Sequence, residues 1–263
     1  MIYSYNTIGF YSDKNNRQYE NTENEKIIHV FETDTIPNFQ IIVDGSITSN
    51  VTYKLYDIND NEIKSGTCTK EAATTENDTA YTRIKLSGAT TTGEDEGRYY
   101  IELTYDSSTI YSDVFCWKDD VSDLLKISVV FGNDLMIGGR ELNVNADTYT
   151  VYLETKNHTE DYEISEEGVE KSYGNLILHS SRNHIVEYII TGYRKTLDFL
   201  AGLRVVSHNG TVKVTLAGEE YEIYDIENPE KSDTYSNSDL IIISFRFKIN
   251  DYLQTINEIN SAV

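Results

Sequence analysis

The chain has 263 residues, a mass of 30.0 kDa and a formal net charge of −22, from 44 acidic and 22 basic side chains. This length favours two domains over one, and 39% hydrophobic residues are enough for packed cores. The acidic balance repels phosphate backbones and anionic membrane surfaces, which argues against a sequence-reading nucleic-acid binder. We therefore expect a folded, soluble protein.

Residues 1–26 mix aromatic side chains with a polar run that has no clear period, so we interpret them as an N-terminal arm. From residue 27 onward, short runs rich in β-branched and aromatic residues follow one another closely. Together they predict an Ig-like β-sandwich over residues 27–118. The predicted strands cover residues 27–32, 39–44, 51–57, 62–68, 81–88, 98–106 and 109–117.

Two links in this half have the composition of tight turns. Residues 57–61 and 106–108 are rich in Asp, Asn and Ser and separate neighbouring strands, so both predict hairpins. Within residues 99–105, apolar side chains alternate with polar ones. The alternation predicts that Tyr99, Ile101, Leu103 and Tyr105 face the core, and that the even-numbered residues, beginning with Tyr100, face water.

The polar stretch 119–125 is the expected linker, and a second antiparallel β domain is expected over residues 126–250. Leucines at helical spacing behind Thr196, which can act as an N-cap, predict one short helix within residues 196–206. The expected fold class is therefore all-β, with one short helix in the second domain. The predicted strands of this half cover residues 124–131, 148–154, 175–180, 184–193, 211–216, 220–227 and 240–249.

Three further expectations concern the C-terminal residues, membrane-crossing segments and the cysteines. Leu253, Ile256 and Ile259 lie three residues apart, which predicts a C-terminal tail helix over residues 251–263. The first residues lack the pattern of a signal peptide, and no apolar run approaches the ~20 residues that cross a bilayer. Cys68 and Cys116 could pair with each other, but two cysteines are too few for a disulfide framework, so we favour free thiols.

No residue pattern predicts catalysis, and we expect no catalytic residue, bound metal or cofactor. Asp57, Asn59 and Asn61 match the first ligands of a calcium loop, but Glu62 and Cys68 stand where that loop needs Gly and Glu. A polar hairpin turn is therefore the favoured interpretation. The five histidines are scattered along the sequence, and His179 and His184 are spaced for neither a helix nor a strand face.

Two other functional hypotheses stay open. The acidic groups 94–96 and 166–167 could supply the carboxylates of a glycan hydrolase, although in so acidic a chain we expect them in solvated loops. The 21 tyrosines could form a carbohydrate-stacking platform, although most should be core residues or cross-strand pairs.

Both chain ends carry apolar side chains on segments too short to bury them alone. Docking onto another subunit would cover these side chains, and so would packing against their own domain. The candidate oligomer contacts are Ile2, Tyr3, Tyr5, Phe10, Tyr11, Tyr252, Leu253, Ile256 and Ile259.

Eight short motifs follow one another from residue 111 to residue 252, with an acidic insertion between the fifth and the sixth. They are YSDVF at 111–115, LKI at 125–127, ND at 133–134, IG at 137–138, TVYLE at 150–154, LDFLA at 197–201, HNGTV at 208–212 and ISFRFKI at 243–249. In this order they resemble a module of virion proteins from tailed bacteriophages that infect gut Bacteroidetes, the crAss-like phages among them.

The resemblance implies a non-enzymatic structural protein of the virion, which forms a ring or collar in the tail or neck, connects portal to tail and lets DNA pass during ejection. It implies rings of about twelve copies, portal and other tail proteins as partners, no membrane, and synthesis in the bacterial host cytoplasm. An acidic ring would not hold the passing duplex, because phosphate contacts need basic side chains. A receptor- or carbohydrate-binding tail or surface module is the alternative.

Overall fold

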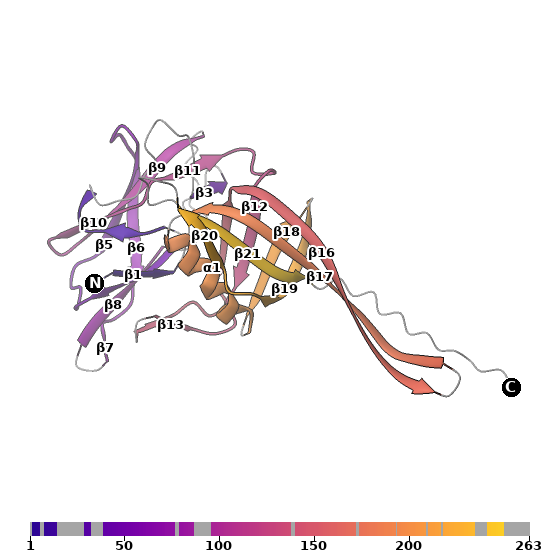
Figure 1. Cartoon of the computed structure of the whole chain (residues 1–263). Helices are drawn as coiled ribbons and strands as arrows, with labels where there is room; N and C mark the ends of the chain where they lie inside the picture. Colours follow the sequence, from indigo (N-terminus) through magenta and orange to yellow (C-terminus); the bar gives the residue numbers. More distant parts are fainter. Residues whose placement is uncertain are drawn as a thin grey trace.

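The described residues form a mainly β structure with one helix (Figure 1). Most of the strands are connected in one large sheet that contains both antiparallel and parallel pairs. The expected fold class is confirmed at this level. The computed structural model describes residues 2–5, 8–14, 29–32, 39–76, 79–86, 96–137, 140–171, 174–192, 194–208, 210–216, 218–234 and 241–249.

Short strands separated by polar turns build the first half of the chain. They are β1 Ile2–Tyr5, β2 Phe10–Tyr11, β3 Val30–Glu32, β4 Phe39–Asp44, β5 Val51–Asp57, β6 Glu62–Lys70, β7 Thr74–Glu76, β8 Thr79–Leu86, β9 Gly97–Tyr105, β10 Ser108–Ser112 and β11 Phe115–Lys118. One layer contains β1, β4, β8 and β7, and the other contains β6, β5, β9, β10 and β2. A cluster of buried apolar side chains, drawn from both layers, lies between them.

Both predicted hairpins are confirmed, because β5 pairs with β6 and β9 pairs with β10 in antiparallel register. In the first turn the carboxylate of Asp57 accepts hydrogen bonds of 2.8 Å from the backbone N–H groups of Asn59 and Asn61. Asp60 and Asp106 have positive φ angles of 66° and 48°, which short polar side chains tolerate. Local turn chemistry therefore sets the register of these strands.

The predicted core face of β9 is also confirmed, since its four odd-numbered residues from 99 to 105 are at most 9% exposed. The prediction that Tyr100 faces water is wrong, because this side chain is only 2% exposed. Its ring stacks on that of Tyr56 at 5.2 Å, and the ammonium group of Lys14 lies over it at 5.0 Å. Residues distant in the sequence therefore cover the outer face of β9 at this point.

The second half combines longer strands with the helix. Its elements are β12 Leu125–Val130, β13 Leu135–Ile137, β14 Arg140–Leu142, β15 Thr148–Leu153, β16 Thr155–Lys171, β17 Gly174–Gly192, α1 Arg194–Ser207, β18 Thr211–Leu216, β19 Glu219–Ile226, β20 Glu230–Thr234 and β21 Ile241–Ile249. Antiparallel pairing gives the strand order β15, β12, β18, β19, β21, β17, β16, with β20 beside the first part of β21. The expected helix is confirmed as α1, and its buried Leu200 and Leu203 join the second apolar core.

The longest strands differ from the sequence prediction. Residues 175–180 and 184–193 were predicted as separate strands, but one strand, β17, runs through both up to Gly192. Leu178 is the extra residue of a β-bulge, because Glu167 pairs with His179 and Gly168 pairs with Ile177. The partner strand β16 contains Glu166 and Glu167, which were wrongly expected in a loop.

The two halves of the chain are joined at two places. First, β3 pairs in parallel with β11 and also contacts β15, so the sheet continues from one half into the other. Second, Ile42 of β4 and Tyr81 of β8 belong to the apolar core of the second half. The side-chain amide of the fully buried Gln40 donates a 3.0 Å hydrogen bond to the carbonyl oxygen of Asn143. The boundaries of the two expected domains stay a prediction.

Charged side chains strengthen the second junction. Arg83 Nε donates a hydrogen bond of 2.5 Å to Glu71 Oε2, and the side-chain amide of Asn143 donates one of 2.8 Å to the same oxygen. Lys85 donates a hydrogen bond of 2.6 Å to the carboxylate of Asp147. Since each bond from Asn143 or to Asp147 crosses between the halves, the second half is held in one orientation on β8 of the first.

In the described part of the chain, no helix is both long enough and apolar enough to cross a membrane. Residues 251–263, where a tail helix is predicted, lie outside the described residues.

The packing of α1 generates a stability prediction. Replacing the fully buried Leu200 by Ala should lower the free energy of unfolding by about 2–5 kcal/mol, because it removes apolar contacts and leaves a cavity. The matched control is Val205→Ala on the exposed side of the helix, where the expected change is within about 0.5 kcal/mol. Urea unfolding of both variants checks this, and equal losses would contradict the packing described.

The buried cysteines generate a second prediction. Both are free thiols, and burial raises the pKa of Cys68 to about 12. At pH 8 only about one Cys68 in ten thousand is then a thiolate, the form that reacts with alkylating reagents. We expect iodoacetamide to leave Cys68 unlabelled in the native protein and to label it rapidly in urea, as read by mass spectrometry. Rapid labelling without urea would contradict its placement.

Candidate interaction surface

The β16–β17 hairpin projects away from the rest of the molecule (Figure 1). Its base belongs to the main sheet, because β21 pairs with β17 from Gly192 to His184. Beyond His184, residues 164–171 of β16 and 174–183 of β17 continue as an antiparallel ribbon of two strands. At ~3.3 Å per residue, the eight residues of β16 in this ribbon span about 26 Å. This ribbon is the part of the described chain with the least support from its own body.

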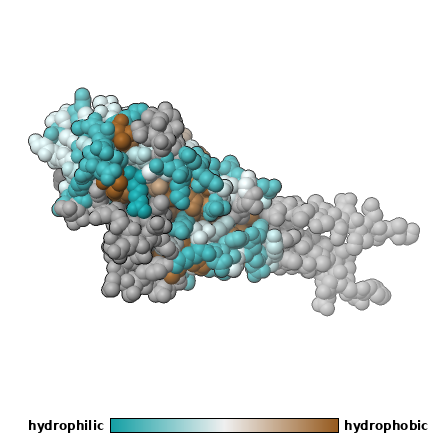
Figure 2. All heavy atoms as spheres, turned by 90° about the horizontal axis from the view of Figure 1, so that it is seen from above, coloured by the Kyte–Doolittle hydropathy of each residue, from teal (hydrophilic) through white to brown (hydrophobic). Residues whose placement is uncertain are grey.

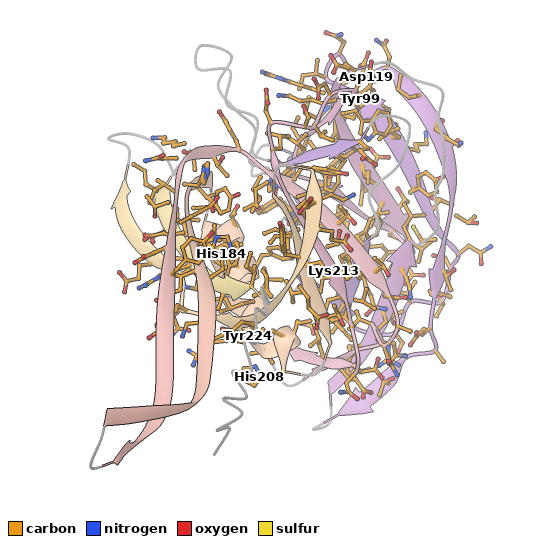
Figure 3. The ribbon with its side chains drawn as sticks, turned by 90° about the vertical axis from the view of Figure 1, so that its right-hand side faces the viewer. Tyr99, Asp119, His184, His208, Lys213 and Tyr224 are labelled. Carbon is orange, nitrogen blue, oxygen red and sulfur yellow. The ribbon has the colours of Figure 1, made fainter. Side chains whose placement is uncertain are left out.

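A cluster of aromatic, histidine and glutamate side chains fixes the base of the hairpin on one face. Cross-strand register places His158 opposite Tyr188 and Tyr162 opposite His184, and the two ring pairs stack at 5.5 Å and 4.5 Å. Glu160 lies between them, with Oε2 3.0 Å from Nε2 of His184 and Oε1 3.6 Å from Nε2 of His158. Figure 3 shows His184 on the strands of this hairpin base.

An ion pair fixes the opposite face of the same base. Lys248 Nζ of β21 lies 3.2 Å from Glu163 Oε2 of β16 and 3.7 Å from Asp225 Oδ2 of β19. The hydrogen bond to Glu163 raises the pKa of Lys248, so its ammonium form is favoured. Because both faces of the base are held, the ribbon leaves the body in a defined direction.

The outer edge of β16 carries features that discourage addition of another strand. Residues 156–163 are all exposed, and the strand contains six acidic and two basic side chains. The backbone N–H groups of His158 and Tyr162 donate to the side chains of the residues that precede them, at 2.9 Å and 2.7 Å. Charged edges whose donors are already used rarely pair with further strands. None of the described strands except β17 pairs with β16.

The coloured part of the face seen in Figure 2 is mostly hydrophilic. Figure 2 shows small separated hydrophobic areas over the coloured part of the face in view. Among the residues whose burial is described, the exposed large hydrophobic side chains are Ile58, Val130, Tyr162, Val205 and Tyr224.

The N-terminal candidates for oligomer contacts lie in β1 and β2, two strands that pair with other strands of their own chain. Phe10 is buried, with its ring 5.0 Å from that of Phe39, so its side chain is not available to a second subunit. Tyr11 is partly exposed in β2, which pairs with β10. A contact role for Tyr11 and for the residues of β1 stays a prediction. Ile2, Tyr3 and Tyr5 lie in β1, which pairs with β4.

The C-terminal candidates Tyr252, Leu253, Ile256 and Ile259 lie outside the described residues.

A buried carboxylate holds the N-terminal segment in place. Asp113 is fully buried, and its Oδ2 accepts a 2.5 Å hydrogen bond from the backbone N–H of Gly9. Its own N–H donates to the carbonyl oxygen of Gly9 at 2.9 Å, and Nε2 of the buried His29 lies 3.7 Å from Oδ2. A Cβ atom at residue 9 would lie 2.8 Å from this carboxylate, so the contact requires glycine.

The acidic residues 94–96 and 166–167, considered above as the carboxylates of a glycan hydrolase, do not form one site among the described residues. Glu96 accepts a hydrogen bond from the backbone N–H of Asp119 at 2.7 Å, whereas residues 94 and 95 lie outside the described part. Glu166 and Glu167 lie in β16, far along the ribbon. Among the described residues, no group of three or more His, Cys, Asp or Glu side chains is arranged to hold a metal ion.

Sequence reasoning missed the hairpin-base cluster. His158, Glu160 and His184 are separated by the whole ribbon along the chain, and cross-strand register brings them together. The alternation His158, Glu160, Tyr162 was the available signal, because it puts three side chains capable of stacking or hydrogen bonding on one strand face.

The chain matches no protein-family model, no curated protein and no solved structure in the three comparisons made.

The environment of Tyr188 generates a pH prediction. Burial, with a smaller contribution from the charge of Glu160, raises its pKa to about 12. The folded state therefore favours the neutral phenol, and this preference contributes to the free energy of unfolding. The contribution is complete below about pH 10, where the tyrosine of an unfolded chain begins to ionise, and it is lost as the pH rises through 12. The difference in phenolate absorbance between wild type and Tyr188→Phe should therefore appear near pH 12. Its appearance near pH 10 would contradict the buried position.

Proposed function

We propose that this chain is a non-enzymatic structural component of a tailed-bacteriophage virion, which assembles into a ring or collar of the tail or neck. The observation that carries the proposal is the β16–β17 ribbon, in which eight residues of β16 and ten of β17 continue past the end of β21. A two-stranded ribbon alone in water is marginally stable. The projecting ribbon therefore favours the interpretation that this protein completes its packing by assembling with other subunits.

The firm attachment of the hairpin supports the same role. The stacked pairs at His158 and Tyr162 hold one face of its base, and the Lys248–Glu163 contact holds the other. The junction between the two halves adds the Lys85–Asp147 pair. A rigid body with one directed ribbon suits an assembly that repeats the same contact around an axis.

Charge and composition are compatible with a ring around a DNA channel. The net charge of −22 disfavours phosphate contacts that would slow a passing duplex. The order of motifs between residues 111 and 252 supplies the resemblance to phage virion proteins. Within this proposal, residues 27–118 form the Ig-like domain, whose two strand layers enclose one apolar cluster.

The proposal is tested by the mass of the purified protein and the shape of its particles. We expect the full chain to form rings, measured by light scattering and negative-stain microscopy over a hundredfold concentration range. In a matched variant, an Asn-Gly turn replaces residues 164–182 and joins residue 163 to residue 183, its cross-strand partner, which keeps the hairpin base. We expect it to stay folded, with an unchanged unfolding transition, but to form no rings.

Two results would contradict this proposal. A full chain that stays monomeric at every concentration has no ring-forming contact. Rings of unchanged size from the shortened variant would show that the ribbon takes no part in assembly.

A further inference from the structure

The outer face of the layer that contains β6, β5, β9 and β10 carries side chains in a regular arrangement. Cross-strand register places four threonines in one row that crosses the strands: Thr109, Thr104, Thr52 and Thr67. Neighbouring strands lie about 4.8 Å apart, so this row spans about 14 Å. All four side chains are exposed or partly exposed, whereas alternate residues of the same strands belong to the apolar cluster between the layers.

The next row on this face adds an aromatic ring and two charges. It contains Tyr111 of β10, Glu102 of β9 and Lys54 of β5, which are cross-strand neighbours. Two residues further along β5, Tyr56 covers Tyr100 with one side of its ring and is itself partly exposed. The face therefore presents one tyrosine on each side of Glu102.

Most of these groups have hydrogen-bonding capacity that the chain itself does not use. The four threonine hydroxyls, the carboxylate of Glu102 and the phenol of Tyr111 form no hydrogen bond with another described residue. A hydroxyl can donate one hydrogen bond and accept two, and a carboxylate can accept about four. Lys54, in contrast, is held by Glu62, with 2.8 Å between Nζ and Oε2. The face thus offers donors and acceptors beside an aromatic ring.

The composition of this face argues against two kinds of partner. A nucleic acid needs a cluster of basic side chains, and the two rows contain one basic residue, Lys54, in a chain of net charge −22. The centre of a protein interface is normally apolar, and neither row contains an aliphatic side chain. A neutral carbohydrate fits both observations, because its hydroxyl groups match polar side chains and its C–H faces pack on aromatic rings.

We propose that the outer face of β10, β9, β5 and β6 binds a neutral oligosaccharide. One sugar ring stacks on Tyr111, and sugar hydroxyl groups form hydrogen bonds with Glu102 and the threonine row. Because the row runs for about 14 Å across the strands, the site takes an extended chain of several sugar units. An open sheet face buries less of a ligand than a pocket does, so we expect millimolar affinity for one copy.

This inference goes beyond the proposed structural role and does not depend on it. If copies assemble into a ring, the ring presents the same face many times. Linked sites then bind a polymeric glycan more tightly than one site does. The carbohydrate-stacking platform considered from the sequence is thereby assigned to two tyrosines of the first half, Tyr111 and Tyr56.

Titrations followed by saturation-transfer NMR test the inference on the full chain. The probes are neutral linear hexasaccharides of glucose, mannose, xylose and N-acetylglucosamine, and we expect at least one of them to bind. Tyr111→Ala should weaken this binding about tenfold because it removes the stacking surface, whereas Tyr111→Phe should bind like wild type. Tyr224→Ala, at an exposed position of β19, is the matched control and should also bind like wild type.

A second variant tests the threonine row. Thr52→Val removes one hydroxyl but keeps nearly the same shape and the preference for a strand, so we expect a stable fold and about threefold weaker binding. Thr159→Val, at an exposed position of β16, is its control. Added salt should leave the binding unchanged, because the ligand carries no charge.

Three results would overturn the inference. The first is failure of every hexasaccharide to bind at millimolar concentrations. The second is binding that neither Tyr111→Ala nor Thr52→Val weakens, and the third is binding that salt abolishes. Ring formation is measured separately by light scattering, so the ring proposal and the carbohydrate site can fail independently.

Discussion

The pairing of β21 with β17 is the interaction on which the rest of the second half depends. On its other side β21 pairs with β20 and β19, so it joins the helix-covered sheet to the hairpin. The pairing ends where Ile249 faces His184, while β17 extends ten residues further. Up to this point the described strands pair with β17 on both sides, and beyond it only β16 does, so the hairpin continues as a ribbon of two described strands.

The body is built so that the direction of the ribbon is fixed. The hairpin base is held by the Tyr162–His184 stack on one face and by Lys248 on the other. The second half is in turn fixed on the first through β3 and through the buried Gln40. Polar contacts of this kind stabilise modestly but fix orientation, because a hydrogen bond holds only over a short distance and near a straight angle. The structural role proposed for the chain requires such a fixed geometry.

The parts of the fold that were predictable from sequence are those set by local chemistry. The turn at Asp57 and the spacing of leucines in α1 act within a few residues, and both predictions are confirmed. Burial of Tyr100 was not predictable, because Lys14 and Tyr56 reach it from other parts of the chain. The ribbon was also missed, since a strand exposed on both faces, as residues 156–163 of β16 are, lacks the alternation that marks a half-buried strand.

The candidate interaction surface was also hard to predict from sequence, because it depends on contacts between distant residues. The N-terminal aromatic residues look available in the sequence, but the position of Phe10 depends on β4, to which no local signal connects it. The two edges of the ribbon, in contrast, can be compared from composition once the register of β16 and β17 is known. Register is the quantity that the sequence alone does not provide here.

Hydrogen exchange at those backbone amides of residues 174–183 that point away from β16 tests the central claim most directly, because these groups form the edge with which no described strand pairs. The account predicts that these amides exchange quickly in dilute monomer and become protected as the concentration rises into the range where copies associate. Protection that is equally strong in the monomer, or equally weak in the associated form, would contradict the claim that assembly completes this edge.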